Sequence, residues 1–115
     1  TSVPALAKSK DKPDFGGNWQ PVMIRDLSTT GACFDSMNDL GQSGERIELK
    51  FNLTVRNLEE NVMLMAIIRN VTDVKATASK RTRARYKFGV QFFEVNRFRE
   101  LLISHYILER MADLD

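Results

Sequence analysis

The chain has 115 residues, of which 43% are hydrophobic and 28% are charged, a composition typical of one globular domain with its own core. This composition excludes a disordered chain, and the formal net charge of +2 is far below that of a protein that coats nucleic acid. No stretch approaches the roughly 18 or more apolar residues of a membrane-spanning helix, so we expect no membrane span.

The N-terminal third of the chain predicts three short strands. Residues 2–8 form a strand-like run, and the polar stretch 9–18 indicates a loop. Residues 19–25 are rich in strand formers. Residues 26–31 have the composition of a turn, which leads into a further strand at residues 32–34.

The middle of the chain predicts three more strands. Residues 37–45 contain two glycines and indicate a loop, and the strict alternation over residues 46–53 predicts a strand with one buried face. The nearly all-apolar residues 61–70 predict a buried strand, which we expect to continue into the sheet over residues 71–79. Residues 86–95 form the last predicted strand.

The C-terminal segment predicts a helix over residues 97–111, with Asn96 placed as its N-cap. Short strands followed by one helix indicate a single domain over residues 1–115, mainly β, in which an antiparallel barrel or sandwich is closed at one opening by the helix. OB-folds share this outline, so the pattern alone leaves the topology open. The helix has these apolar residues at spacings of three and four, as expected of a core-facing side: Phe98, Leu101, Leu102, Ile107, Leu108 and Met111.

The cysteine and methionine residues indicate the cellular location of the protein and part of its core. Cys33 is the only cysteine, so no intramolecular disulfide can form, and we expect a reducing, cytoplasmic location. We interpret Cys33 as a buried hydrophobic residue and Met63, Met65 and Met111 as core filling.

The sequence lacks the patterns of an enzyme. His105 is the only histidine and has no second histidine or nucleophile beside it in the sequence, so neither a metal site nor a catalytic role is predicted for it. No phosphate-binding glycine loop, serine elbow or HExxH motif is present. We therefore expect a protein that binds and does not catalyse, with no cofactor.

Two short motifs lie on the predicted strands. Residues 26–31 (DLSTTG) have the pattern DxSxxG, and residues 89–92 (GVQF) have the pattern GVxF and precede the predicted helix. In their order and separation the two motifs resemble the PilZ domain family. The resemblance covers most of the chain and implies a small six-stranded antiparallel β-barrel with a C-terminal α-helix. It also implies binding of the bacterial second messenger cyclic di-GMP.

The residues of the first motif suit such a ligand. The Asp26 carboxylate can accept two parallel hydrogen bonds from a guanine, and the Ser28 hydroxyl two residues later can reach the same ligand. Gly31 permits a positive backbone torsion or a close approach of the main chain. The alternative is that Asp26 and Ser28 only shape a turn, with Gly31 at its left-handed position.

One feature that the resemblance implies is missing from this sequence. Cyclic di-GMP receptors of the family resemble one another in an RxxxR motif just before the first strand, and no such pair precedes Asp26. We expect the arginines to lie upstream of Thr1, in a longer parent protein of which this chain is a C-terminal piece. Lys8 and Lys12 have the same spacing but do not precede the first predicted strand, and lysine lacks the planar fork of arginine.

Other arginines are secondary candidates for the ligand's phosphates. Arg25 adjoins Asp26, whereas Arg81, Arg83 and Arg85 alternate in sequence and would share one face of a strand. A charged outer edge that opposes aggregation is the alternative for these three.

The sequence thus predicts a switch. Cyclic di-GMP would bind and reorient an attached domain or a protein partner, and the resemblance implies outputs in motility, biofilm formation or exopolysaccharide production. The first alternative is a PilZ domain that has lost the ligand and serves as a protein-interaction adaptor, for example in type IV pilus assembly. The second is an OB-like nucleic-acid binder, although no nucleic-acid partner is expected.

Overall fold

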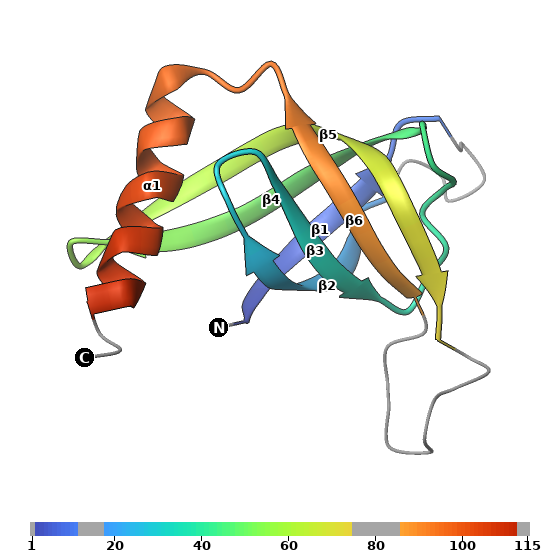
Figure 1. Ribbon diagram of the computed structural model, residues 1–115, viewed down its shortest axis with the longest axis horizontal. Helices are drawn as coiled ribbons and strands as arrows, with labels where there is room; N and C mark the ends of the chain where they lie inside the picture. The colour runs from blue at the N-terminus through green and yellow to red at the C-terminus, as the bar shows by residue number, and fades with distance from the viewer. Residues whose placement is uncertain (1, 12–17, 75–85, 113–115) are drawn as a thin grey trace.

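The computed structural model describes residues 2–11, 18–74 and 86–112 (Figure 1). Within these residues six antiparallel strands close into a barrel in the order β1-β2-β3-β6-β5-β4, and a helix follows the last strand. The prediction of a six-stranded antiparallel barrel with a C-terminal helix is therefore confirmed. The elements are β1 (Val3–Ser9), β2 (Gln20–Leu27), β3 (Gly31–Ser36), β4 (Arg46–Val55), β5 (Leu58–Asp73), β6 (Tyr86–Phe93) and α1 (Arg97–Ala112).

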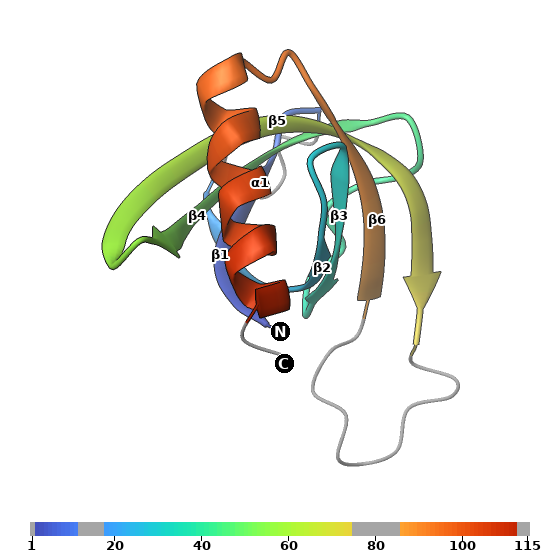
Figure 2. The ribbon, with the colours of Figure 1, turned by 60° about the vertical axis from the view of Figure 1, so that its left-hand side comes forward.

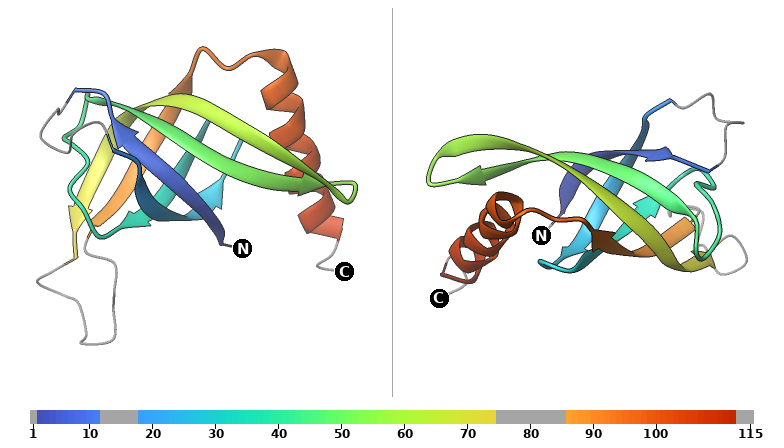
Figure 3. Two further views of the ribbon diagram at one scale, coloured as in Figure 1. Left: turned by 180° about the vertical axis from the view of Figure 1, so that it is seen from behind. Right: turned by 90° about the horizontal axis from the view of Figure 1, so that it is seen from above.

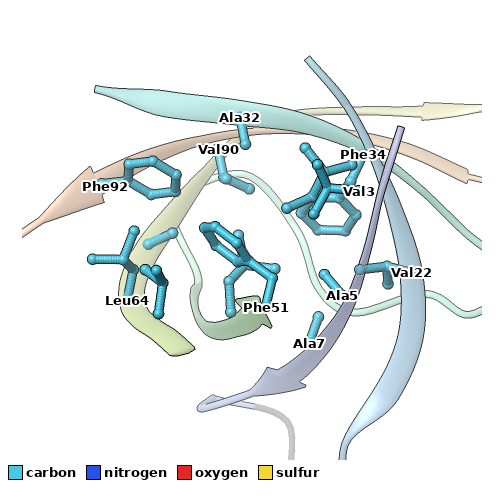
Figure 4. Close-up of a cluster of buried hydrophobic side chains, with 14 of the residues drawn as sticks. Val3, Ala5, Ala7, Val22, Ala32, Phe34, Phe51, Leu64, Val90 and Phe92 are labelled. Atoms are coloured by element: carbon cyan, nitrogen blue, oxygen red, sulfur yellow. The ribbon is translucent and has the colours of Figure 1, made fainter. Parts of the chain in front are cut away.

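The core lies inside the barrel, where every strand contributes alternate side chains (Figure 4). In β1, for example, Val3, Ala5 and Ala7 are buried, because successive side chains of a strand point to opposite faces. Phe34 of β3 and Phe88 of β6 are both buried in this core and stack with ring centroids 5.3 Å apart. The strand pairing thus places one contiguous apolar core between the backbones.

The apolar stretch of β5 obeys the same alternation, so it is buried on one side only. Val62, Leu64 and Ala66 are buried, whereas Met63 is 39% exposed and Met65 is half-buried. The interpretation of Met63 as core filling is wrong, because its side chain points to the outside of the barrel. The predicted continuation of the strand reaches Asp73, and residues 75–79 lie outside the described residues.

Helix α1 lies across one end of the barrel (Figures 2 and 3). It begins as predicted, since Asn96 Oδ1 accepts the backbone N–H of Arg99 at 2.8 Å, which is the contact of an N-cap. Its buried side chains are Ile103 and Tyr106. The helix meets the barrel along a narrow face only. The prediction of a core-facing side is therefore wrong for four of its residues, which are exposed by 45% to 63%: Phe98, Leu101, Leu108 and Met111.

Cys33 is exposed, not buried as predicted, because its neighbours in β3, Ala32 and Phe34, occupy the inward positions. Among the described residues, no helix combines the length and the apolar character needed to cross a bilayer.

An ion pair links the segment after β1 to the start of β4. Asp11 Oδ2 accepts the backbone N–H of Arg46 at 2.6 Å, and Asp11 Oδ1 accepts Nη2 of the same residue at 3.0 Å. The side-chain hydrogen bond, and after it the backbone one, lowers the pKa of the Asp11 carboxyl, and the same pairing raises the pKa of Arg46. The pair therefore stabilises the ionised form of Asp11 in the folded protein.

This pairing predicts a pH-dependent contribution to stability. Because the folded pKa of Asp11 lies below the unfolded one, the contribution is present above the ordinary carboxyl pKa of about 3.9 and is lost as the pH falls through the lower folded value. Asp11→Asn should lower the melting temperature slightly at neutral pH, since the pair is exposed. Melting curves of the two proteins should converge in acid, and a difference that persists unchanged there would contradict this role.

Candidate ligand-binding site

A β-bulge in β2 places Asp26 on the outside of the barrel. Val22 and Ile24 point inward, so an unbroken alternation would bury Asp26 as well. Instead, the register of β2 against β3 shifts between Ile24 and Asp26, which leaves Arg25 as the extra residue of the bulge. Asp26 is consequently exposed, although it lies two residues after the buried Ile24 and would face the core in a regular strand.

The carboxylate of Asp26 is available to a ligand. Its side chain makes no hydrogen bond or ion pair with any residue that the structure describes. The alternative interpretation, in which Asp26 only shapes the turn, does not hold for this residue, because Asp26 and Leu27 belong to β2 and the turn begins at Ser28. Both oxygens can therefore accept hydrogen bonds from an incoming group.

The Ser28 hydroxyl, in contrast, builds the turn between β2 and β3. Its Oγ accepts the backbone N–H groups of Thr30 and Gly31 at 3.2 and 3.1 Å, and the backbone N–H of Ser28 donates to Gly31 O at 2.9 Å. This is the local side-chain-to-backbone bonding typical of a serine turn. Ser28 thus holds the loop in shape, and it also lines the same surface as Asp26.

Gly31 is required by a close approach of two backbones. A Cβ atom at this position would lie 2.3 Å from the carbonyl oxygen of Val90, so the two strands could not keep their spacing. The alternative of a left-handed glycine is wrong, because the described glycines with positive φ are Gly41 and Gly44. Of the two predicted roles for Gly31, close approach is the one found.

The residues of the motif border a shallow hollow of about 250 Å³ on the outer surface of the barrel, here called the Asp26 hollow. Its lining residues come from β2, β3, β6 and β5, or from the turn between β2 and β3, and these four strands are neighbours in the barrel. Gly31 and Gly89 contribute only backbone atoms to the lining of the hollow, because neither has a side chain. The lining residues are Asp26, Ser28, Gly31, Ala32, Cys33, Arg69, Asn70, Gly89 and Val90.

The far wall of the hollow was not predicted from the sequence. In β5, Ala66 and Ile68 point inward and Asn70 would be next, but the register against β6 shifts between Ile68 and Asn70. Arg69 is the extra residue of this second bulge, and both Arg69 and Asn70 are exposed and line the hollow. A polar asparagine at an inward position of an apolar strand is the signal that could have located this wall.

Arg25 lies outside the Asp26 hollow. Its Nε donates to Asp35 Oδ2 at 2.8 Å and its Nη1 donates to Ser2 Oγ at 2.7 Å. These contacts hold the guanidinium beside the neighbouring strands β1 and β3. The other secondary candidates, Arg81, Arg83 and Arg85, lie outside the described residues.

A second cleft, of about 210 Å³, adjoins the hollow on the side of the helix. Val3, Arg25 and Asp26 form its barrel side, and Tyr106 and Arg110 are among the residues that form its α1 side. The Arg110 guanidinium lies over the Tyr106 ring, 5.0 Å from its centroid. Asp26 is therefore common to the hollow and to the cleft under α1.

Comparison with known proteins provides an independent assignment. Residues 6–109 match the family model described as PilZ domain, which spans most of the chain. No curated protein has a significant match to the sequence.

Two solved structures have similar folds. The inhibitor of motility MotI/DgrA of Bacillus subtilis superposes with a TM-score of 0.72 at 13% identity, over 97% of this chain and 48% of that one. The PilZ domain of YcgR from Escherichia coli, solved with cyclic di-GMP, superposes with a TM-score of 0.65 at 17% identity, over 97% of this chain and 91% of that one. This chain thus spans about half the length of the MotI/DgrA chain.

Proposed function

Since this chain belongs to the PilZ domain family, we propose that it is a cytoplasmic receptor for cyclic di-GMP that acts by binding and not by catalysis. The observation that carries the proposal is the exposed Asp26 carboxylate, which has no partner among the described residues and borders the Asp26 hollow. The structure of the YcgR PilZ domain with cyclic di-GMP supports the choice of ligand.

The chemistry of the ligand matches this surface. A guanine presents two adjacent donors, N1–H and the N2 amino group, and an ionised carboxylate accepts both in parallel. An adenine presents an acceptor at N1, so Asp26 would repel it. The Ser28 turn and the close approach at Gly31 hold the loop beside Asp26, so the carboxylate is presented with little loss of backbone entropy.

The path of β1 supports a contribution from residues upstream of Thr1. Val3 pairs with Ile24 in the β1–β2 ladder, so a chain that precedes Val3 would lead past Arg25 towards Asp26. Ser2 already contacts Arg25. Arginines on such a segment would reach the phosphates of a ligand held at Asp26, and ordering this segment would reposition an attached domain or partner, with motility, biofilm formation or exopolysaccharide production as the output.

The proposal is tested by titration of the protein that includes the residues preceding Thr1 in its gene. Isothermal calorimetry should give saturable binding of cyclic di-GMP and none of cyclic di-AMP. A parallel titration with single-stranded DNA tests the alternative of a nucleic-acid binder, for which the affinity for DNA would fall steeply with salt concentration. Binding of DNA without binding of cyclic di-GMP would overturn the proposal.

One observation favours an adaptor as the second candidate function. The outer face of α1 presents Phe98, Leu101, Leu108 and Met111 to solvent, and clustered exposed apolar side chains are typical of interaction surfaces. The double variant Leu101→Glu, Leu108→Glu should then lose a protein partner that wild type retains in pull-down from its own cells. An adaptor that is independent of the ligand should keep that partner in the Asp26→Ala variant, and loss of the partner there would argue for the receptor.

A further inference from the structure

The two bulges of the barrel face each other across the Asp26 hollow. The bulge in β2 turns Asp26 outward, and the bulge in β5 turns Asn70 outward and adds Arg69 beside it. Between them lies Gly89, which lets the Asn70 side chain lie close to its backbone, since a Cβ atom there would come within 3.1 Å of Asn70 Nδ2. The hollow thus has an acidic wall and an opposite wall with a cation and an amide.

The guanidinium of Arg69 is oriented by a neighbour. Its Nε donates to Gln91 Oε1 at 2.9 Å, and Gln91 is the β6 residue paired with Gly31. No other side-chain hydrogen bond or ion pair of Arg69 is found with the described part of the chain. Because Nε is engaged, the two terminal nitrogens of the fork remain free to donate in parallel to one ligand.

We propose that Arg69, with Asn70 beside it, is a guanine-binding residue that reads the O6/N7 edge of the base whose Watson–Crick edge is held by Asp26. This inference rests on the proposed function and extends it to a residue outside the motif. Guanine carries its two donors on one edge and its acceptors O6 and N7 on the next, so a carboxylate and a guanidinium from different walls can contact one base. Arginine donating to O6 and N7 is the common pairing with guanine.

The size of the hollow favours a base over the whole ligand. At about 250 Å³ it is smaller than the roughly 300–1,000 Å³ of pockets that enclose a complete small molecule. One guanine can enter, while the ribose and phosphates stay outside, towards the segment that precedes β1. A base held by acceptors on one side and donors on the other would be distinguished from adenine at both edges.

The inference is tested by Arg69→Met, which keeps an unbranched apolar stem and removes the fork, in the protein with its upstream residues. Calorimetry should show affinity for cyclic di-GMP reduced about 10- to 100-fold, the range expected for one bidentate arginine–guanine contact. The matched control is Arg56→Gln, at the β4–β5 turn, which removes an exposed positive charge outside the hollow and should leave affinity within about twofold.

A ligand analogue identifies the edge that is contacted. Cyclic di-GMP with carbon in place of N7 should bind wild type several-fold more weakly than the natural ligand, and this penalty should disappear in Arg69→Met. Gln91→Leu removes the acceptor of the Arg69 Nε hydrogen bond, so it should weaken binding of cyclic di-GMP when Arg69 is present. Added to Arg69→Met, it should have no further effect on binding. Such coupling would show that Gln91 acts on binding by positioning Arg69 and not through a general effect on the fold.

The outcomes separate this inference from the proposed function. Failure of wild type to bind cyclic di-GMP overturns both. Loss of binding in Asp26→Ala together with unchanged binding in Arg69→Met leaves the proposed function standing and overturns the role of Arg69. An equal penalty for the N7-substituted analogue in wild type and in Arg69→Met overturns the assignment to the O6/N7 edge.

Discussion

Replacing Asp26 by alanine should abolish binding of cyclic di-GMP while the protein stays folded. Two charge-assisted hydrogen bonds, each contributing about 1.5–3 kcal/mol, are lost together, so affinity should fall by about 100-fold or more. The exposed side chain has no partner among the described residues, so the change in unfolding free energy should stay within about 0.5 kcal/mol. Calorimetry measures the first effect and thermal denaturation the second.

Two further variants test whether binding depends on the position of the carboxylate and on its negative charge. Glu100→Ala removes an exposed carboxylate from α1, outside the hollow, and should leave the affinity near that of wild type. Asp26→Asn should lose binding nearly as fully as alanine, because its amide group would face the two guanine donors with a donor of its own. Retained binding in Asp26→Ala would mean that the ligand lies elsewhere.

Replacing Gly31 by alanine should destabilise the fold. The new Cβ would lie 2.3 Å from Val90 O, and since that atom belongs to the backbone, β3 and β6 must separate. Overpacking of this kind costs about 1–3 kcal/mol. For a domain of this size the melting temperature should fall by about 4–8 °C for each kcal/mol.

The second glycine of the hollow is the control for this prediction. A Cβ on Gly89 would meet the side chain of Asn70 at 3.1 Å, and a side chain can shift where a backbone cannot. Gly89→Ala should therefore lower the melting temperature much less than Gly31→Ala does. It should still weaken binding of cyclic di-GMP, because it narrows the hollow. Equal melting temperatures for the two variants would show that the approach of Val90 O to Gly31 does not limit which residue fits there.

Much of the fold could be predicted because its physical causes are local in the sequence. Alternation over β4 defines a half-buried strand, and Asn96 defines the start of α1. The segments assigned to the six strands pair into the closed barrel that the DxSxxG and GVxF motifs implied. The motif also led to Asp26, and the structure places that carboxylate at the surface.

The far wall of the site could not be predicted, because a bulge changes which side chains face outward. Asp26 and Asn70 both occupy inward positions by simple alternation, and each is exposed only because one extra residue precedes it. Such a shift depends on the partner strand, and therefore on pairing between segments far apart in the sequence. The motif located Asp26, but no motif indicated Arg69.

The wrong predictions have a related cause. Cys33 and Met63 are apolar by composition, yet both lie on the outward face of a strand, where none of the described elements covers them. The helix has more apolar residues than its contact with the barrel can bury. Hydrophobic pattern predicts which residues could form a core, whereas the area that is covered depends on the assembled fold.

We expect cyclic di-GMP to bind across the hollow between the two bulges. A titration followed by the backbone amide signals of the ¹⁵N-labelled protein in NMR tests this binding site directly. Saturable shifts should be concentrated at Asp26, Gly31, Asn70 and Gly89, with small changes at the β4–β5 turn. Saturation without shifts at these residues, or shifts confined to the outer face of α1, would contradict it.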